Sequence, residues 1–199
     1  MPMHDWTKVD AQIYHAFHAF WISELSRTLN GGLLPDEYYS LIEITFPNLS
    51  LETHFAATTE PEVCLHVQSS IAVKDVRDDR TVAMIEIISP GNRSNRLGIR
   101  ALSDKTEELI ERRIHSLIID PFQLPVDEPL TLVAYESDLI TLASIETVAV
   151  GRSLPDMPLF LQPNGCVMVP LEATYNAAFE AMPRRWRKVL ENIGTAPQS

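Results

Sequence analysis

The sequence lacks the patterns that mark several large classes of protein. Its 199 residues hold only two cysteines, and Cys64 and Cys166 stand far apart with no CxxC spacing. We therefore expect reduced thiols in the core rather than a disulfide framework or a zinc site. No apolar run reaches the roughly 18 to 20 residues needed to cross a bilayer, and the first ten residues do not have the layout of a signal peptide. These absences predict a cytoplasmic protein with no membrane partner.

Positive charge is also scarce. The chain has 16 Lys and Arg against 27 Asp and Glu, so its formal net charge is −11. This balance disfavours non-specific binding of the whole chain to nucleic acid or to an anionic membrane, because phosphate contacts need an excess of cations. Nucleic acid remains a partner only through a local basic patch.

One basic segment stands out near the end of the chain, with the sequence Arg184-Arg185-Trp186-Arg187-Lys188. Arginine and tryptophan together could stack bases and neutralise phosphates. In the competing interpretation Trp186 docks the last helix on the core while the cations complement the helix C-terminus or pair with the many carboxylates. The net charge favours this second interpretation.

What the sequence does contain is an ordinary globular composition, with 45 % hydrophobic and 22 % charged residues. Such a chain can bury a sizeable core. We expect one domain over residues 1–199, with a core at about 10–150. A C-terminal extended arm and helix are expected at about 151–192.

Hydrophobic periodicity predicts the elements of the first half. Spacings of three and four predict a helix at 10–29, which Asn30-Gly31-Gly32 ends. Alternating or continuous apolar runs predict strands, and the last two form a hairpin around a charged turn. The expected strands are 38–46, 48–55, 63–74 and 81–88.

The second half begins with the breaker Ser89-Pro90-Gly91-Asn92, followed by a helix at 101–113 and a buried strand at 116–119. Segments 130–135 and 145–150 predict an antiparallel ribbon at a sheet edge. Four prolines in 154–170 predict an extended arm on the surface, and Pro183 should interrupt a final helix at 171–192. The order predicts an α/β (α+β) fold with a single mixed, largely antiparallel sheet, an N-terminal helix and a crossover helix.

Glu86 is the most informative residue, because it is a carboxylate inside the apolar strand TVAMIEII. A buried charge without a partner costs several kcal/mol, so Glu86 needs one. Arg93, Arg96, Arg100 and Lys105 are nearby candidates. Ser89 and Asn92, with the backbone N–H groups of the turn, form a weak candidate for binding an anion.

The blocks TVAMIEIISPGNRS, HDW…YHAFHAFWISEL and VAVGRSLPDMPLFL…AMPRRWR closely resemble a bacterial family of uncharacterised proteins, domain of unknown function 4058. More distantly, the Glu-Ile-Ile-Ser-Pro run is similar to the third core strand of PD-(D/E)XK nuclease-like domains, in particular Uma-type putative endonucleases. The resemblance implies a restriction-endonuclease-like core in which one helix precedes three antiparallel strands, and a helix and a further strand follow.

Nucleases of this type hold Mg²⁺ with an Asp and a Glu and use a Lys to orient water. The resemblance places Glu86 at the Glu position and Asn48 at the Asp position, while Ile88 stands where the Lys should be and Lys105 is a possible migrated lysine. Asn48 offers a neutral oxygen where Mg²⁺ needs a carboxylate. The resemblance thus implies a degenerate metal site.

Three functional hypotheses remain open. The leading one is a non-catalytic or degenerate nuclease-like domain with an interaction or accessory role. The alternatives are an active Mg²⁺-dependent nuclease using Glu86 and Lys105, and a homo-oligomeric accessory protein. The pair His15 and His18 on the first helix could ligate a metal only if a third ligand came from elsewhere.

Overall fold

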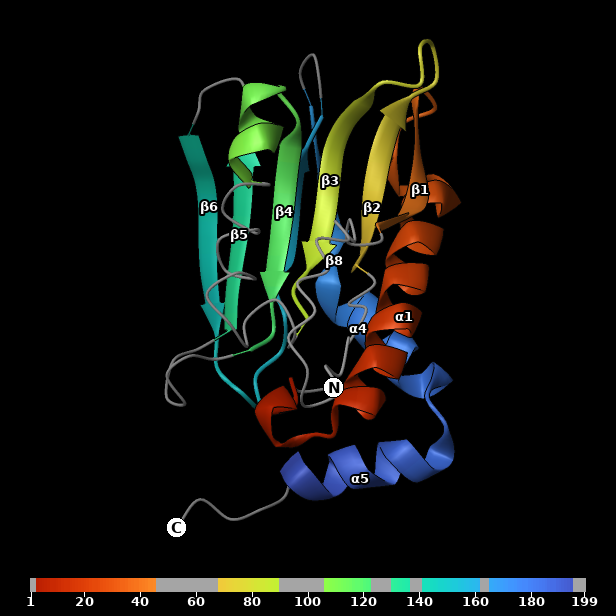
Figure 1. Cartoon of the computed structure of the whole chain (residues 1–199), viewed down its shortest axis with the longest axis vertical. Helices are drawn as coiled ribbons and strands as arrows, with labels where there is room; N and C mark the ends of the chain where they lie inside the picture. Colours follow the sequence, from red (N-terminus) through yellow and green to blue (C-terminus); the bar gives the residue numbers. More distant parts are fainter. Residues whose placement is uncertain are drawn as a thin grey trace, which may run out of the picture.

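The computed structural model describes residues 3–45, 68–89, 106–122, 130–136, 141–161 and 165–194. A six-stranded sheet lies at its centre, and the spatial order of the strands follows the chain, as Figure 1 shows. The strands are β1 (Tyr38–Thr45), β2 (Gln68–Asp75), β3 (Thr81–Ile87), β4 (His115–Asp120), β5 (Leu130–Glu136) and β6 (Thr141–Val148).

All neighbouring strands of this sheet are antiparallel except β3 and β4, which run parallel. Parallel neighbours need a crossover connection, and the described part of that connection contains a helix at 106–111. The expected class is confirmed: the fold is mixed α/β with a largely antiparallel sheet, an N-terminal helix and C-terminal helices. The expected strand at 48–55 lies outside the described residues.

The N-terminal helix α1 (Ala11–Thr28) follows from its sequence. Asp10 caps it by accepting a hydrogen bond from the Gln12 backbone N–H at 2.8 Å, which satisfies one of the donors left open at a helix start. Its end unwinds through a π-helical turn, η2 (Leu29–Leu33). Gly32 has φ of +112° there, a conformation that glycine adopts without steric cost.

One face of the sheet packs against α1 and the two-stranded sheet of β7 (Asp156–Phe160) and β8 (Cys166–Pro170), and helix α4 (Leu171–Ala181) packs against α1 and β7. The core between these layers is aromatic-rich, with Trp6, Phe17, Trp21 and Tyr175 almost completely buried. Trp21 Nε1 donates a hydrogen bond to Thr174 Oγ1 at 3.1 Å. The first helix therefore depends on the C-terminal helix for its packing.

The expectation of an irregular surface arm at 154–170 is wrong. This segment forms the hairpin of β7 and β8, and it buries Met157, Leu159 and Val169 in the core. The prolines are compatible with pairing because of the register. The Leu161 N–H donates to the Gly165 carbonyl, and in an antiparallel ladder every second pair of facing residues is hydrogen-bonded. Counting back from this pair, Pro158 and Pro170 fall in the pairs that are not hydrogen-bonded, where no N–H is needed.

The break expected at Pro183 is confirmed, because α4 ends at Ala181 and α5 (Arg184–Gly194) follows. Helix α5 lies across one end of the molecule, as Figure 1 shows. None of the described helices is long and apolar enough to span a membrane.

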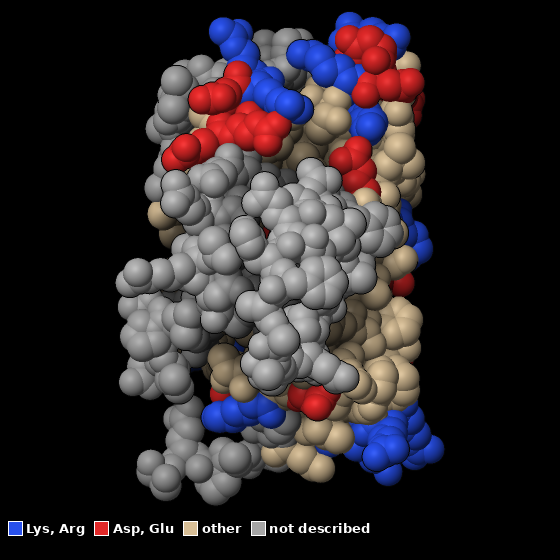
Figure 2. All heavy atoms as spheres, viewed as in Figure 1, with Lys and Arg blue, Asp and Glu red and all other residues tan. Residues whose placement is uncertain are grey.

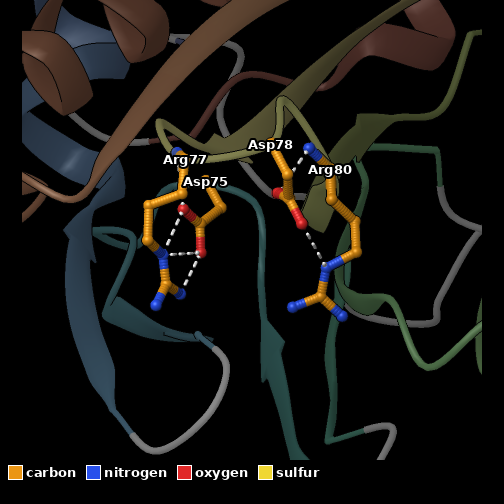
Figure 3. Close-up of polar contacts among 4 residues, drawn as sticks. All are labelled: Asp75, Arg77, Asp78 and Arg80. Atoms are coloured by element: carbon orange, nitrogen blue, oxygen red, sulfur yellow. Dashed lines mark hydrogen bonds and ion pairs between the residues drawn. The ribbon is translucent and has the colours of Figure 1, made fainter.

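The turn between β2 and β3 is held by ion pairs, shown in Figure 3. Arg77 Nε donates to Asp75 Oδ1 at 2.9 Å, and these hydrogen bonds lower the pKa of Asp75 to about 2. Arg80 N–H donates to Asp78 Oδ1 at 3.1 Å. Asp75 and Arg77, and likewise Asp78 and Arg80, thus pair within the turn, whereas Asp79 accepts a hydrogen bond from the Tyr39 hydroxyl on β1 at 2.7 Å.

Strand β1 is an edge of the sheet, and Asn30 occupies part of that edge. The Asn30 side chain accepts the Ser40 N–H at 2.8 Å and donates to the Ser40 carbonyl at 3.0 Å. The Asn30 amide thus makes the two hydrogen bonds to Ser40 that a residue of a neighbouring strand would make. Beyond it, Ile42 and Ile44 are exposed, which leaves an apolar length of edge.

Candidate functional site

Glu86 lies on β3 and is buried, with 7 % of its surface exposed. The register places it directly beside Ser70 on β2 and Ile118 on β4. It does have an interaction partner, as its burial requires. Its nearest cross-strand neighbours, however, carry no charge.

Other polar side chains share the face of the sheet that carries Glu86. Ser116 and Asp120 belong to the same face of β4 as Ile118, because side chains alternate along a strand. Both are buried, as is Ser70, and the Ser116 hydroxyl has no hydrogen-bond partner among the described residues. Strand spacing and rise put the Cα atoms of Glu86 and Asp120 roughly 8 Å apart. This buried polar face is opposite to the face that packs on α1.

The carboxyl ends of the parallel pair meet the start of α1. Tyr14 Oη donates to the Ile88 carbonyl at 2.6 Å, and His18 Nε2 lies 3.1 Å from the Ile87 carbonyl. Asp120 Oδ1 accepts the Phe122 N–H at 3.1 Å. Burial, followed by the nearby charge of Asp120, raises the pKa of Tyr14 well above its usual value. These contacts fix the strand ends rather than leave open groups for a ligand.

His18 is neutral in this setting. Burial lowers its pKa to about 4, although the hydrogen bond to Ile87 opposes the shift. A carbonyl only accepts, so Nε2 carries the proton and Nδ1 does not. His15 is exposed on the same helix. No group of three or more His, Cys, Asp or Glu residues able to hold a metal occurs in the described ranges, so the third ligand that a histidine site needs is not found there.

Several residues singled out from the sequence cannot be compared with the structure. Asn48, Asn92, Arg93 and Lys105 lie outside the described residues. Ser89 is described and half-buried just after β3. Of the expected site, Glu86 and Ser89 are therefore described, and the other four positions stay predictions.

The basic segment starts helix α5. Trp186 is partly buried and packs against the hydrophobic core, as the second interpretation of the sequence expected for this ring. That interpretation expected the four cations around it either to complement the C-terminus of the helix or to pair with carboxylates. They lie instead at the start of α5, and none forms an ion pair with a carboxylate in the described part of the chain.

Sequence reasoning missed a buried polar pair at the N-terminus. His4 Nδ1 lies 2.7 Å from Tyr175 Oη, and the His4 ring stacks on Phe179. Burial lowers the pKa of His4 to about 4. The only signal in the sequence was a histidine beside Trp6 in a segment without periodicity, and it gave no indication of the partner.

The expectation of buried cysteines is wrong for Cys166, which is an exposed free thiol. It lies at the start of β8, on the side of the hairpin that faces away from Val169 and the core. Burial nevertheless raises the pKa of its thiol. Cys64 lies outside the described residues.

Comparison with known proteins places no further constraint on the site. No family model, no curated protein and no solved structure matches the chain.

Proposed function

We propose that this chain is a nuclease-like domain that lacks the metal-binding carboxylate pair of nucleases and has an interaction or accessory role. The proposal depends on one observation. The residue that faces Glu86 from β2 is Ser70, and the residue that faces it from β4 is Ile118. A neutral hydroxyl and an aliphatic chain stand on either side of the carboxylate.

The order of elements supports the nuclease-like part of the proposal. A helix, α1, precedes the three antiparallel strands β1, β2 and β3, and the helix at 106–111 leads to β4 beside β3. This is the order that the resemblance to PD-(D/E)XK domains implies. A fold, however, does not carry an activity, which must be argued from the site.

Among the described residues, no carboxylate stands directly beside Glu86 on β2 or β4, and the second buried carboxylate of that face, Asp120, lies two residues further along β4. Mg²⁺ prefers an octahedron of oxygens with one or two carboxylates, and a phosphodiester in the site adds negative charge that the metal must balance. Ser70, which pairs with Glu86 from β2, is a neutral hydroxyl, and Asn48, the residue at the expected Asp position, lies outside the described residues. Ile88, two positions after Glu86, is fully buried and offers no group that could activate water.

The test is to restore the missing carboxylate. Ser70→Asp places a second carboxylate beside Glu86, and we expect this variant to bind Mn²⁺ or Mg²⁺ more than tenfold tighter than the natural chain in calorimetry. Ser69→Asp is the matched control, because adjacent side chains of a strand point to opposite faces. Equal metal binding by the two variants would contradict the proposal.

The alternative is an active Mg²⁺-dependent nuclease, and Asp120 is the observation that favours it. This second buried carboxylate shares a face with Glu86. Cleavage of single- and double-stranded DNA with Mg²⁺ or Mn²⁺ decides between the two. Cleavage by the natural chain that is lost in Glu86→Ala would establish the nuclease and overturn our proposal, whereas we expect no cleavage from either protein.

A further inference from the structure

Helix α5 begins with a concentration of positive charge that the rest of the molecule does not have. Arg184, Arg185, Arg187 and Lys188 are four of its first five residues, in a chain of net charge −11. Figure 2 shows cations gathered at the end of the molecule where α5 lies in Figure 1. This concentration needs a physical explanation.

The helix presents all four cations to one side. Successive residues of an α-helix are turned by about 100°, so the four cations span an arc of roughly 160°. Trp186 and Leu190 fall on the opposite side, where Leu190 is completely buried and Trp186 packs on the core. Arg184, Arg185 and Lys188 are exposed, and Arg187 is half-buried. We call this arc, which by the same geometry also holds the exposed Glu191, the basic face of α5.

The basic face has no carboxylate partner in the part of the chain that the structure describes. Six other cations of the described residues do form ion pairs, namely Lys8, Arg27, Lys74, Arg77, Arg80 and Arg112. The four charges also lie at a helix N-terminus, where the helix dipole opposes positive charge and favours an anion. The cluster is thus unfavourable within the protein itself.

We propose that the basic face of α5 binds nucleic acid through its phosphate backbone, without reading the bases. Three of the four cations are arginines, whose planar guanidinium matches phosphate oxygens in pairs. Trp186 is turned toward the core and does not offer its ring for stacking, so the contacts are with phosphates. Four adjacent cations can neutralise a short run of phosphates along one strand.

Two other anionic partners fit the basic face less well. An amphipathic helix that binds a membrane inserts an apolar face between lipids. Trp186 and Leu190 of α5 are used by the core, and among the α5 side chains that the structure describes Val189 is the one exposed apolar residue. An acidic protein surface is the other candidate. Carboxylates are in surplus on this chain, yet none of them pairs with the basic face in the described ranges. We therefore consider the carboxylates of another protein a poorer match for this face than phosphates.

The net charge of the chain does not prevent this binding. At physiological salt, charges are screened over about 8 Å. The charged turn after β2 and the helix at 106–111, which carries Glu107, Glu108 and Glu111, lie at the far end of the sheet from α5 in Figure 1. Repulsion from these carboxylates therefore acts weakly at the basic face.

The test is fluorescence anisotropy with a labelled oligothymidylate of about 30 nucleotides and a duplex of the same length, over a series of NaCl concentrations. Single strands give a slope of log Kobs against log[salt] of about −0.7 per neutralised phosphate, so four cations predict a slope near −3 for the oligothymidylate. Removing three cations in R184A/R185A/K188A should weaken binding at least tenfold at low salt and reduce the slope by about 2.

The control variant, R27A/R112A/R152A, removes the same amount of charge from exposed positions elsewhere. It should bind like the natural chain. Equal losses in the two variants would mean that net charge alone matters and would overturn the inference. No binding by the natural chain at low salt, or binding only to phosphatidylserine vesicles or polyglutamate, would overturn it as well. The inference does not depend on the nuclease-like proposal, because it makes no use of Glu86.

Discussion

At the scale of single residues, two buried histidines make the protein sensitive to acid. His4 and His18 each have a pKa lowered by burial to about 4 from an ordinary value of 6.5. The unfolded chain therefore binds more protons than the folded chain between these two values. Stability is at its full value above about pH 6.5 and falls as the pH drops toward 4.

We expect the free energy of unfolding to fall by about 1 to 2 kcal/mol per histidine between pH 7 and pH 5. His4→Phe should lose less stability over this range, because phenylalanine can keep the stacking on Phe179 without taking up a proton. Urea denaturation at the two pH values measures the difference. His15→Gln, at an exposed position of α1, is the control, and an equal reduction in both variants would contradict the assignment to His4.

The residues also show what the sequence could not provide. A carboxylate in an apolar strand was recognisable, so Glu86 could be predicted to be buried and partnered. Its neighbour Ser70 could not, because a register is set by packing across strands and not by either strand alone. His4 and Tyr175 are separated by 171 positions, and no local pattern connects them.

At the scale of elements, the hairpin of β7 and β8 shows where composition misleads. Four prolines indicated an irregular arm, yet the alternation of the buried residues Met157, Leu159 and Leu161 was also in the sequence and proved decisive. The first helix and the strands β1, β3, β4 and β5 were predicted close to their observed bounds, because their periodicity is regular over a full turn or several alternations. The strand expected at 145–150 begins four residues earlier, as β6 (Thr141–Val148). Proline excludes a strand only where its missing N–H is needed.

Two methionines of this hairpin provide a matched test of its burial. Met157 is completely buried and Met168 is 48 % exposed. Met157→Ala should lower the free energy of unfolding by about 2 to 4 kcal/mol, because it leaves a cavity. Met168→Ala should change it by less than about 0.5 kcal/mol. Equal and small effects in denaturant titrations would show that the hairpin does not pack on the core.

The edge of β1 gives a second prediction for an element. Asn30→Ala removes both hydrogen bonds to Ser40 and should cost about 1 kcal/mol of stability. It also frees the edge beside Ile42 and Ile44, so we expect more self-association in light scattering. Asn30→Asp keeps the hydrogen-bond acceptor and loses the donor, so its stability and self-association should lie between those of the natural chain and of Asn30→Ala. A fully monomeric Asn30→Ala of unchanged stability would contradict this role.

At the scale of the whole molecule, one hydrophobic core joins the N-terminal segment, the sheet and the C-terminal helices. The Met3 N–H donates to the Arg152 carbonyl, the Gly151 N–H donates to the Met3 carbonyl, and the His4 ring lies within hydrogen-bond distance of the Tyr175 hydroxyl. The expectation of a single domain predicts one cooperative transition. Tryptophan fluorescence, from Trp6, Trp21 and Trp186, and far-ultraviolet circular dichroism should give coincident denaturation curves. Two separate transitions would show that the C-terminal part folds independently.

The packing of α1 against α4 has a consequence for synthesis on the ribosome. Phe17 and Trp21 contact Tyr175, whose codon is read long after theirs. At about 5 to 20 residues per second, the aromatic face of α1 waits about 10 to 30 s for its partner. The nascent chain therefore exposes the aromatic residues of α1 during most of translation. We expect chaperones that bind emerging aromatic segments to hold α1 until the last helices leave the exit tunnel.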